Sequence, residues 1–456
     1  MTIIHSPQTA LLALSPLDGR YEAKLKTLRP ICSEYGLIYY RLLVEIEWLK
    51  ALADDSAITE LKALSSTAKT FLQKLIDNCN AKTVQAIKAE EKVTRHDVKA
   101  IEYYLQKQLK KLPELKSAIP FLHFACASED INNLAYGLMM KDARQKVLLP
   151  AMKLLQKQLK KHSQQWMRVP MLARTHGQPA SPTTMGKEIA NFAYRLERQL
   201  NTFAKLPILG KINGAVGNFN AHLVAYPKIN WLRFAKKFVQ SLGLTFNPFT
   251  TQIEPHDGLA EILHTLIRFN TIALDLCRDM WSYISLNYFS QQKIENEVGS
   301  STMPHKINPI DFENAEGNLG LANALADHLA MKLPVSRFQR DLSDSTVLRN
   351  LGVVLGHSLL AYQSLLTGLA KLSLNEKFLT NELNEHWEIL TESIQTVMRK
   401  HGISNAYEQL KKFSRGKKLN QVMLHQFIDS IDLPLDVKIQ LKNLTPMNYI
   451  GRIICL

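Results

Sequence analysis

The sequence predicts an all-α protein of three domains with a central bundle of long helices. Three observations lead to this fold class. Apolar residues recur at steps of three and four over long stretches, and no comparable run alternates with a period of two. Glycine and proline gather between these stretches, where they would end helices. The chain is 46% hydrophobic, enough for a sizeable core, and its 456 residues correspond to about three domains.

The expected N-terminal helical domain covers residues 1–116 and ends after the lysine-rich, proline-containing segment QKQLKKLPELK. The central long-helix bundle domain covers residues 117–369. Shorter and more polar helical patterns follow, and they predict a small C-terminal helical domain at 370–456.

Three apolar seams define the helices of the central domain, because their spacing places each set of side chains on one helix face. Pro150 within the first seam suits a first helical turn or a kink. Such seams predict long antiparallel helices packed together. The seam residues are Leu148, Met152, Leu155 and Leu159; Ile189, Ala193, Leu196 and Leu200; and Ile262, Leu266, Phe269, Ala273, Leu276, Met280 and Tyr283.

Loops are expected at residues 175–184, 207–220, 245–258 and 298–309, which concentrate glycine, proline or asparagine. In the last of these a helix restarts. Asn308 can cap it and Pro309 suits its first position.

The uncharged stretch at residues 351–370 is as long as a membrane span, but it carries His357, Tyr362 and Gln363. We therefore expect a buried bundle helix and no membrane association. The N-terminus has no basic segment before a short apolar run, so no secretory signal is expected. The five cysteines form no C-x-x-C spacing, which favours reduced thiols in the cytoplasm over disulfides or a zinc site.

The net charge of +15 admits nucleic acid, an anionic membrane surface or small anionic substrates as partners. The densest basic cluster, Lys153, Lys157, Lys160 and Lys161, lies opposite an apolar stripe and is interpreted as a solvated helix face. No aromatic-basic platform accompanies it, so nucleic acid is not expected to bind.

Three polar segments lie between the apolar helices. Arg174–Pro179 holds His176, which can transfer a proton near neutral pH, although a loop histidine by itself is more often non-catalytic. Ser128–Asn133 opens a helix, and capping alone could account for it. The segment GSSTMPHKINP, from Gly299 to Pro309, combines hydroxyls, a lysine and an amide before a helix N-terminus, which suits carboxylate binding.

The last segment closely resembles the signature of the fumarase/aspartase superfamily, whose members eliminate fumarate or a close relative from a substituted succinate. Within that superfamily, SPLDGRY, ARTHGQPA and His305 in the signature resemble the bacterial adenylosuccinate lyase family, and the likeness extends over nearly the whole chain. The resemblance implies a carbon–nitrogen lyase that releases fumarate from succinylated purine nucleotides. It also implies a homotetramer in which the bundles form one helical core and the subunits share active sites.

The same resemblance assigns the site. His176 corresponds to the general acid, Ser300 to the general base and Glu313 to the carboxylate that orients the histidine. Ser301, Lys306 and Asn308 correspond to a clamp on the succinyl carboxylates. The remaining substrate-binding positions implied by the resemblance are Arg20, Tyr21, Arg95, His96, Asp97, Ser128, Gln252, Asn314, Arg340, Ser345 and Arg349.

One position departs from the family pattern. Ala127 stands before Ser128 where the family usually has threonine, and the lost hydroxyl is expected to weaken substrate binding by roughly 0.5–1.5 kcal/mol. Neither the acid nor the base is affected.

No metal and no cofactor are expected, since the histidines and carboxylates lack ligand spacing such as H-x-x-x-H. The nearest alternative is another fumarate-releasing lyase of the superfamily, of the argininosuccinate lyase or fumarase type, in which THLQ commonly replaces THGQP. Two further alternatives are a helical scaffold without catalytic activity and a basic nucleic-acid-binding protein.

Overall fold

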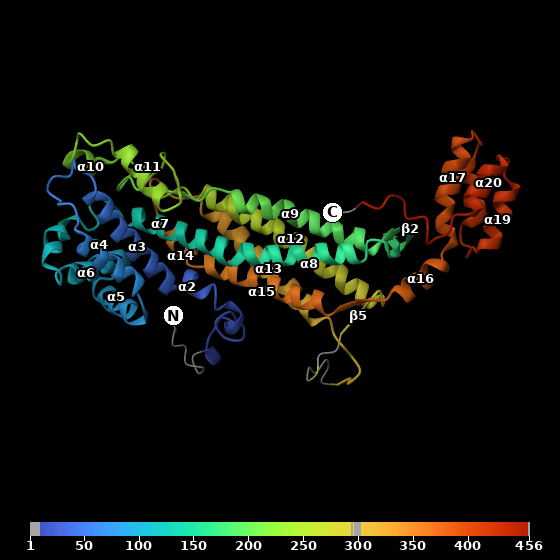
Figure 1. The fold of residues 1–456 in the computed structure, drawn as a ribbon, viewed down its shortest axis with the longest axis horizontal. Coiled ribbons are helices and arrows are strands. Elements are labelled where there is room, and N and C mark those ends of the chain that lie inside the picture. The colour runs from blue at the N-terminus through green and yellow to red at the C-terminus, as the bar shows by residue number, and fades with distance from the viewer. Residues whose placement is uncertain (1–9, 293–294, 296–301, 455–456) are drawn as a thin grey trace. The chain divides into compact units, whose positions relative to one another are not determined.

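The computed structural model describes residues 10–292, 295 and 302–454, and it confirms the all-α class. Helices make up most of the described chain (Figure 1). The described strands form three two-stranded sheets: β1 with β2, β3 with β4, and β5 with β6.

The chain folds into two compact units, each drawn from several stretches of sequence. Unit 1 comprises Met1–Met152, Gln199–Thr271 and Gly317–Tyr362, and unit 2 comprises Lys153–Arg198, Ile272–Glu316 and Gln363–Leu456. Five helices contribute a segment to both units: α8 (Leu149–Gln165), α9 (Met185–Lys205), α12 (Asp257–Ser285), α13 (Ile310–Lys332) and α15 (Leu351–Ala370). The division at residues 116 and 370 stays a prediction.

Each of the other elements lies entirely within one of the two units. The label η marks a 3₁₀ helix, except for η3, which is a π-helical turn. Unit 1 holds η1 (Glu22–Leu25), α2 (Arg29–Cys32), α3 (Glu34–Ala53), α4 (Ser66–Asp77), α5 (Ala81–Thr94), α6 (Asp97–Leu109), η2 (Pro113–Phe121), α7 (Ser128–Asp142), η3 (Ala143–Leu148), β3 (Leu209–Gly210), α10 (Asn220–Ala225), α11 (Trp231–Ser241), β4 (Thr245–Phe246) and α14 (Ser343–Leu348). Unit 2 holds β1 (Pro170–Thr175), β2 (Gln178–Thr184), β5 (Phe289–Gln291), β6 (Leu372–Leu374), α16 (Glu376–Asn384), η4 (Trp387–Leu390), α17 (Thr391–Lys400), α18 (Ala406–Ser414), α19 (Gln421–Ser430) and α20 (Leu435–Lys442).

The predicted seams are the buried faces of the long helices. On α12, every seam residue from Ile262 to Met280 is at most 1% exposed, and Tyr283 is half-buried. Burial of each large apolar side chain contributes about 1.5–3 kcal/mol, so the seams account for much of the core. Pro150 follows the π-helical turn η3 as the second residue of α8, in agreement with its expected place in a first turn or kink.

Polar contacts join the same helices within each unit. In unit 1, the Asn270 amide of α12 donates to the Ser358 hydroxyl of α15 at 3.0 Å. In unit 2, an ion pair between Arg195 and Asp275 at 2.9 Å links α9 to α12. The long helices therefore pack through their apolar seams, and polar pairs between neighbouring helices add specific contacts.

The uncharged stretch at 351–370 is the helix α15, as predicted. It belongs to Ser343–Ala370, the one helical stretch in the described residues that could cross a membrane by length and composition. Of its most apolar window, 72% is buried inside the protein, which is typical of a core helix.

The last helices of the chain surround a small core of their own. Leu390, Met398, Leu424 and Ile428 are at most 1% exposed within this cluster, and Leu172 of β1 packs into it. Figure 1 shows α17, α19 and α20 grouped together in red.

The predicted loop at 175–184 is wrong, because most of it is strand β2 of a hairpin with β1. Proline suggested a loop, but a two-stranded sheet tolerates proline because both of its strands are edges. Pro179 lies opposite Arg174 and Pro182 lies opposite Leu172, next to an irregularity in the register.

The expected start of the helix after residue 308 is one residue early. Helix α13 begins at Ile310, and the Pro309 carbonyl accepts hydrogen bonds from the Phe312 and Glu313 amides at 3.1 and 3.3 Å. Pro309 thus occupies the cap rather than the first helical turn.

Candidate active site

The predicted site residues fall into two groups, one in each unit. Unit 1 carries Arg20, Tyr21, Arg95, His96, Asp97, Ser128, Gln252, Arg340, Ser345 and Arg349. Unit 2 carries His176, Lys306, Asn308, Glu313 and Asn314, while Ser300 and Ser301 lie outside the described residues.

The junction of α5 and α6 presents His96 and Asp97. His96 is the N-cap of α6, and its Nδ1 accepts a hydrogen bond from the Lys99 amide at 3.2 Å. In a neutral imidazole this leaves the proton on Nε2, which lies 3.5 Å from the Ser128 hydroxyl at the start of α7. Helix capping therefore fixes the ring and directs its other nitrogen toward Ser128.

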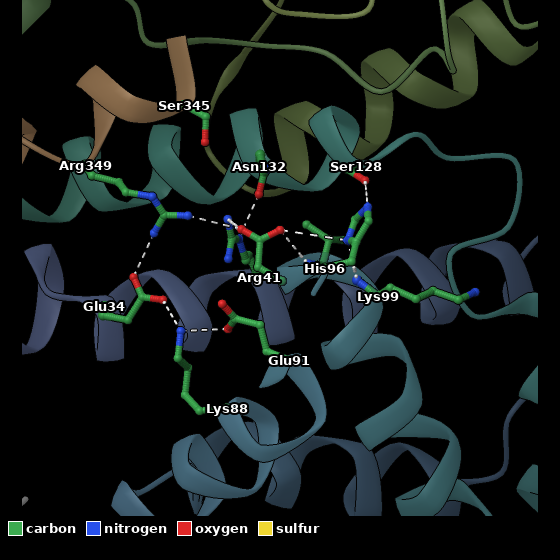
Figure 2. Close-up of polar contacts among 12 residues, drawn as sticks. Glu34, Arg41, Lys88, Glu91, His96, Lys99, Ser128, Asn132, Ser345 and Arg349 are labelled. Carbon is green, nitrogen blue, oxygen red and sulfur yellow. Dashed lines mark hydrogen bonds and ion pairs between the residues drawn. The ribbon is translucent and has the colours of Figure 1, made fainter. Parts of the chain in front are cut away.

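Asp97 is held between two arginines, Arg41 and Arg349, which Figure 2 labels. Its Oδ2 lies 2.7 Å from the buried Arg41 and 3.3 Å from Arg349. Burial alone would raise the pKa of the Asp97 carboxyl, but Arg41, the Val98 amide and Arg349 lower it below its ordinary value. Asp97 is thus an anion that orients the Arg349 guanidinium.

Arg349 also reaches Glu34 of α3 at 3.0 Å, and Glu34 in turn pairs with Lys88 at 3.1 Å. Figure 2 shows the Ser345 hydroxyl directed toward this cluster. Arg349 is held by two carboxylates and remains 42% exposed, as an anion-binding residue at a surface would be.

A second arginine is held in the same unit. The Arg340 guanidinium donates to the Gln252 side chain at 3.1 Å and to Glu129 at 3.0 Å. The resemblance did not indicate Glu129 as a site residue, although it belongs to the polar segment that opens α7.

The other three predicted positions of unit 1, Arg20, Tyr21 and Arg95, are less enclosed. Arg20 and Tyr21 lie in the turn before η1, with the guanidinium carbon 5.9 Å from the ring centroid. Arg95 ends α5 in a left-handed conformation with φ of 53°, and its side chain is exposed. Their predicted roles in nucleotide binding stay predictions.

His176 occupies the tip of the β1–β2 hairpin. Thr175 pairs with Gln178, so His176 and Gly177 form a two-residue turn, with φ of 53° and 75°. Two positive φ angles are the requirement of a type I′ turn. The imidazole is exposed, and it makes no hydrogen bond or ion pair within the described part of the chain.

Strand β1 is anchored close to this turn. Arg174 of β1 pairs with Glu382 of α16 at 2.6 Å, and the same carboxylate accepts from the Tyr288 hydroxyl at 2.5 Å. The anchor fixes the strand while the turn presents His176 outward.

Glu313 and Asn314 lie in the first turn of α13, and both have partners. Glu313 accepts from the Trp281 indole at 3.1 Å, and Asn314 accepts from the Ser364 hydroxyl at 2.8 Å. No hydrogen bond joins Glu313 to His176 among the described residues of one chain. The predicted pairing of this carboxylate with the catalytic histidine stays a prediction.

Lys306 is exposed in a turn before α13, where its backbone amide donates to the Met303 carbonyl at 3.0 Å. Asn308 follows and is half-buried. Among the described residues, no group of three or more histidine, cysteine or acidic side chains is arranged to hold a metal.

Ala127, the departure from the family pattern, is the N-cap of α7. Its amide donates to Asp130 at 2.7 Å, but the side chain has no hydroxyl with which to cap the helix in return. Threonine at this position would therefore also contribute to helix capping.

Comparisons with known proteins show which family this sequence matches. Residues 19–323 match the family described as "Lyase", and residues 336–450 match "Adenylosuccinate lyase C-terminal". The chain is 54% identical to an adenylosuccinate lyase of Escherichia coli over 446 residues, covering 98% of each protein. The chain belongs to the adenylosuccinate lyase family.

Other relatives of this adenylosuccinate lyase family member are as similar. The adenylosuccinate lyases of Haemophilus influenzae and Legionella pneumophila are 53% and 54% identical and cover 97% of each chain. The C-terminal family match and these relatives disfavour the other lyases of the superfamily.

Solved structures extend the likeness to the fold. A fumarate lyase from Mesorhizobium sp. BNC1 aligns with a TM-score of 0.73 at 16% identity, covering 93% of this chain and 95% of that one. A 3-carboxy-cis,cis-muconate lactonizing enzyme from Pseudomonas putida aligns with a TM-score of 0.72 at 18% identity, covering 94% and 95%. This adenylosuccinate lyase family member thus has the fold of the fumarase/aspartase superfamily.

Proposed function

We propose that this enzyme eliminates fumarate from adenylosuccinate to give AMP, and from succinylated aminoimidazole carboxamide ribotide to give the free carboxamide. The observation that carries the proposal is the family membership, with about half of all residues identical to adenylosuccinate lyases over 97–98% of the chain. The substrates carry a phosphate and two carboxylates. Arg340, Arg349 and the net charge of +15 suit such an anion.

In the proposed reaction, the Ser300 side chain in its alkoxide form takes the proton from the succinyl carbon next to a carboxylate and thereby becomes a neutral hydroxyl. The carbon–nitrogen bond then breaks, and its electron pair remains on the nitrogen, which takes a proton from His176. Serine is a weak base at its ordinary pKa, so it must be activated by its surroundings. Histidine suits the acid because its ordinary pKa lies near neutral pH.

The intermediate carries extra negative charge on a carboxylate that is already anionic. Donors placed in advance stabilise such a charge by about 3 kcal/mol each. Lys306, Asn308 and Ser301 are proposed to supply them, with the N-terminus of α13 adding its dipole. The reaction needs proton transfer and charge stabilisation from the chain's own residues, and no cofactor.

We propose that the enzyme works as a homotetramer with shared active sites. An exposed stripe along α13 supports this assembly: Gly317, Leu321 and Ala324 follow one another at steps of four and three, Gly320 lies beside them, and Leu321 is 54% exposed. Small and apolar residues of this kind allow close packing against helices of another copy. Sharing is also consistent with the lack of a hydrogen bond between His176 and Glu313 among the described residues of one chain.

The proposed compartment is the cytoplasm. All four cysteines in the described residues are free, and burial raises the pKa of the Cys32 and Cys79 thiols to about 12 and about 11. Such thiols are inert and suit a reducing compartment.

Subunit complementation tests the acid, the base and their sharing together. His176→Ala and Ser300→Ala are each expected to be inactive, whereas tetramers reassembled from both are expected to regain activity. If the two residues come from different chains, about a quarter of the sites are intact, because each chain supplies its unmutated residue half of the time. Mixing either variant with itself is the control. Absence of recovery in mixed tetramers would place His176 and Ser300 of each site on one chain.

A further inference from the structure

A chain of polar contacts runs through unit 1 from Arg349 to Gln252, and Arg41 lies in the middle of it. Arg41 is on α3 and is 1% exposed. One terminal nitrogen donates to Asp97 at 2.7 Å, and its Nε donates to the Asn132 side-chain oxygen at 2.7 Å. Figure 2 shows Arg41 close to Asn132.

Each partner of Arg41 leads to one of the two arginines assigned to substrate anions. On one side, Asp97 forms an ion pair with Arg349 at 3.3 Å. On the other side, the Asn132 side-chain amide donates to the Glu129 carboxylate at 2.8 Å. The same carboxylate accepts a hydrogen bond from Arg340 at 3.0 Å.

Stability alone is a poor reason for an arginine at this position. The second terminal nitrogen of Arg41 is buried and has no hydrogen-bond partner among the described residues. A buried donor without a partner destabilises the fold, and buried ion pairs can often be replaced by apolar residues without loss of stability. The geometry offers a different benefit, because a planar guanidinium holds two acceptors at a fixed mutual angle.

We infer that Arg41 is a positioning residue that fixes Asp97 and Asn132 and thereby sets the directions in which Arg349 and Arg340 meet the substrate. This inference rests on the proposed function. Arg41 itself touches neither substrate nor reacting atoms; it acts through two carboxylates and an amide.

The test compares Arg41→Lys with Arg144→Lys in steady-state assays on adenylosuccinate. Arg144 is a matched control, since it is also buried in unit 1 but donates to the Phe203 and Leu206 carbonyls, outside this chain of contacts. Lysine keeps the charge but cannot hold both acceptors of Arg41. We expect the KM of Arg41→Lys to rise about tenfold, as for the loss of one charge-assisted hydrogen bond, with kcat changed less than about threefold.

A residue that only supports folding would give a different pattern. It would lower the active fraction, so that kcat falls and KM stays unchanged, and Arg144→Lys is expected to behave in that way. The inference is overturned if Arg41→Lys lowers kcat without raising KM, or if both variants raise KM equally. Should Arg41→Lys fail to fold, Asn132→Ser breaks the same link and is expected to raise KM by a similar factor. Inactivity of the wild-type protein would instead count against the proposed function.

A double variant tests whether Arg41 couples the two arms of this chain of contacts, the one that leads to Arg349 and the one that leads to Arg340. Gln252→Ala removes a partner of Arg340 at the far end of the chain of contacts. If the arms are joined, the KM of Arg41→Lys with Gln252→Ala rises by less than the product of the two separate increases. An effect equal to that product would overturn the joining role.

Discussion

Replacing His176 with alanine is expected to lower kcat by about 10²–10⁴-fold, the usual contribution of a general acid. The nitrogen leaves poorly as an anion, so loss of the proton donor raises the barrier for the bond that breaks. KM for adenylosuccinate is expected to change little, because the acid acts in the transition state rather than in substrate binding. Steady-state fumarate release by wild type and variant measures both quantities.

The position of His176 on the hairpin requires a second variant. Its φ is 53°, a region that alanine tolerates poorly and asparagine tolerates well. His176→Asn therefore keeps the turn while removing the titrating group, and it should lose as much activity as His176→Ala. An exposed histidine elsewhere in unit 2, His401, provides the control, and His401→Ala should retain full activity. Near-normal turnover by His176→Asn would refute the assignment of the acid.

Replacing Lys211 with methionine is expected to destabilise the protein by about 3–5 kcal/mol, because it leaves a buried carboxylate without its cation. The Lys211 ammonium lies 2.9 Å from Asp130, and both side chains are 0% exposed. Asp130 also accepts hydrogen bonds from the backbone amides of Asn213 and Gly214, at 2.9 and 3.2 Å. The pair thus ties the start of α7 to the segment after β3.

Urea unfolding followed by circular dichroism measures this loss. The matched control is Lys69→Met, since Lys69 pairs with Asp54 at 2.7 Å but the two side chains are 45% and 56% exposed. An exposed pair contributes about 0–1 kcal/mol. Equal shifts of the urea midpoint in the two variants would show that burial of the Lys211–Asp130 pair adds no stability.

The sequence predicted the long helices well because their signal is local and repeated. The seam of α12 and the uncharged stretch of α15 each extend over 20 residues or more, so the helical period outweighs any single residue. The β1–β2 hairpin was missed because Pro179 and Pro182 are local loop signals, whereas the pairing that tolerates them is made with β1.

The sequence predicted only those site residues that belong to recognisable motifs. Most substrate positions came from short strings that resemble the family, and the structure joins several of them in unit 1. Arg41 lies in an apolar stretch of α3 without a motif, and its partners Asp97 and Asn132 are 56 and 91 residues away in sequence. A charged residue within a buried helix was the available signal, but its partners depend on the tertiary fold.

Fumarate release from adenylosuccinate by the purified wild-type protein, in the presence of a metal chelator, tests the central claim most directly. Release at the same rate with and without the chelator is the predicted result. A folded protein that releases no fumarate from adenylosuccinate, but does so from argininosuccinate or malate, would contradict the assigned substrate. A folded protein that releases fumarate from none of the three would contradict the lyase function itself.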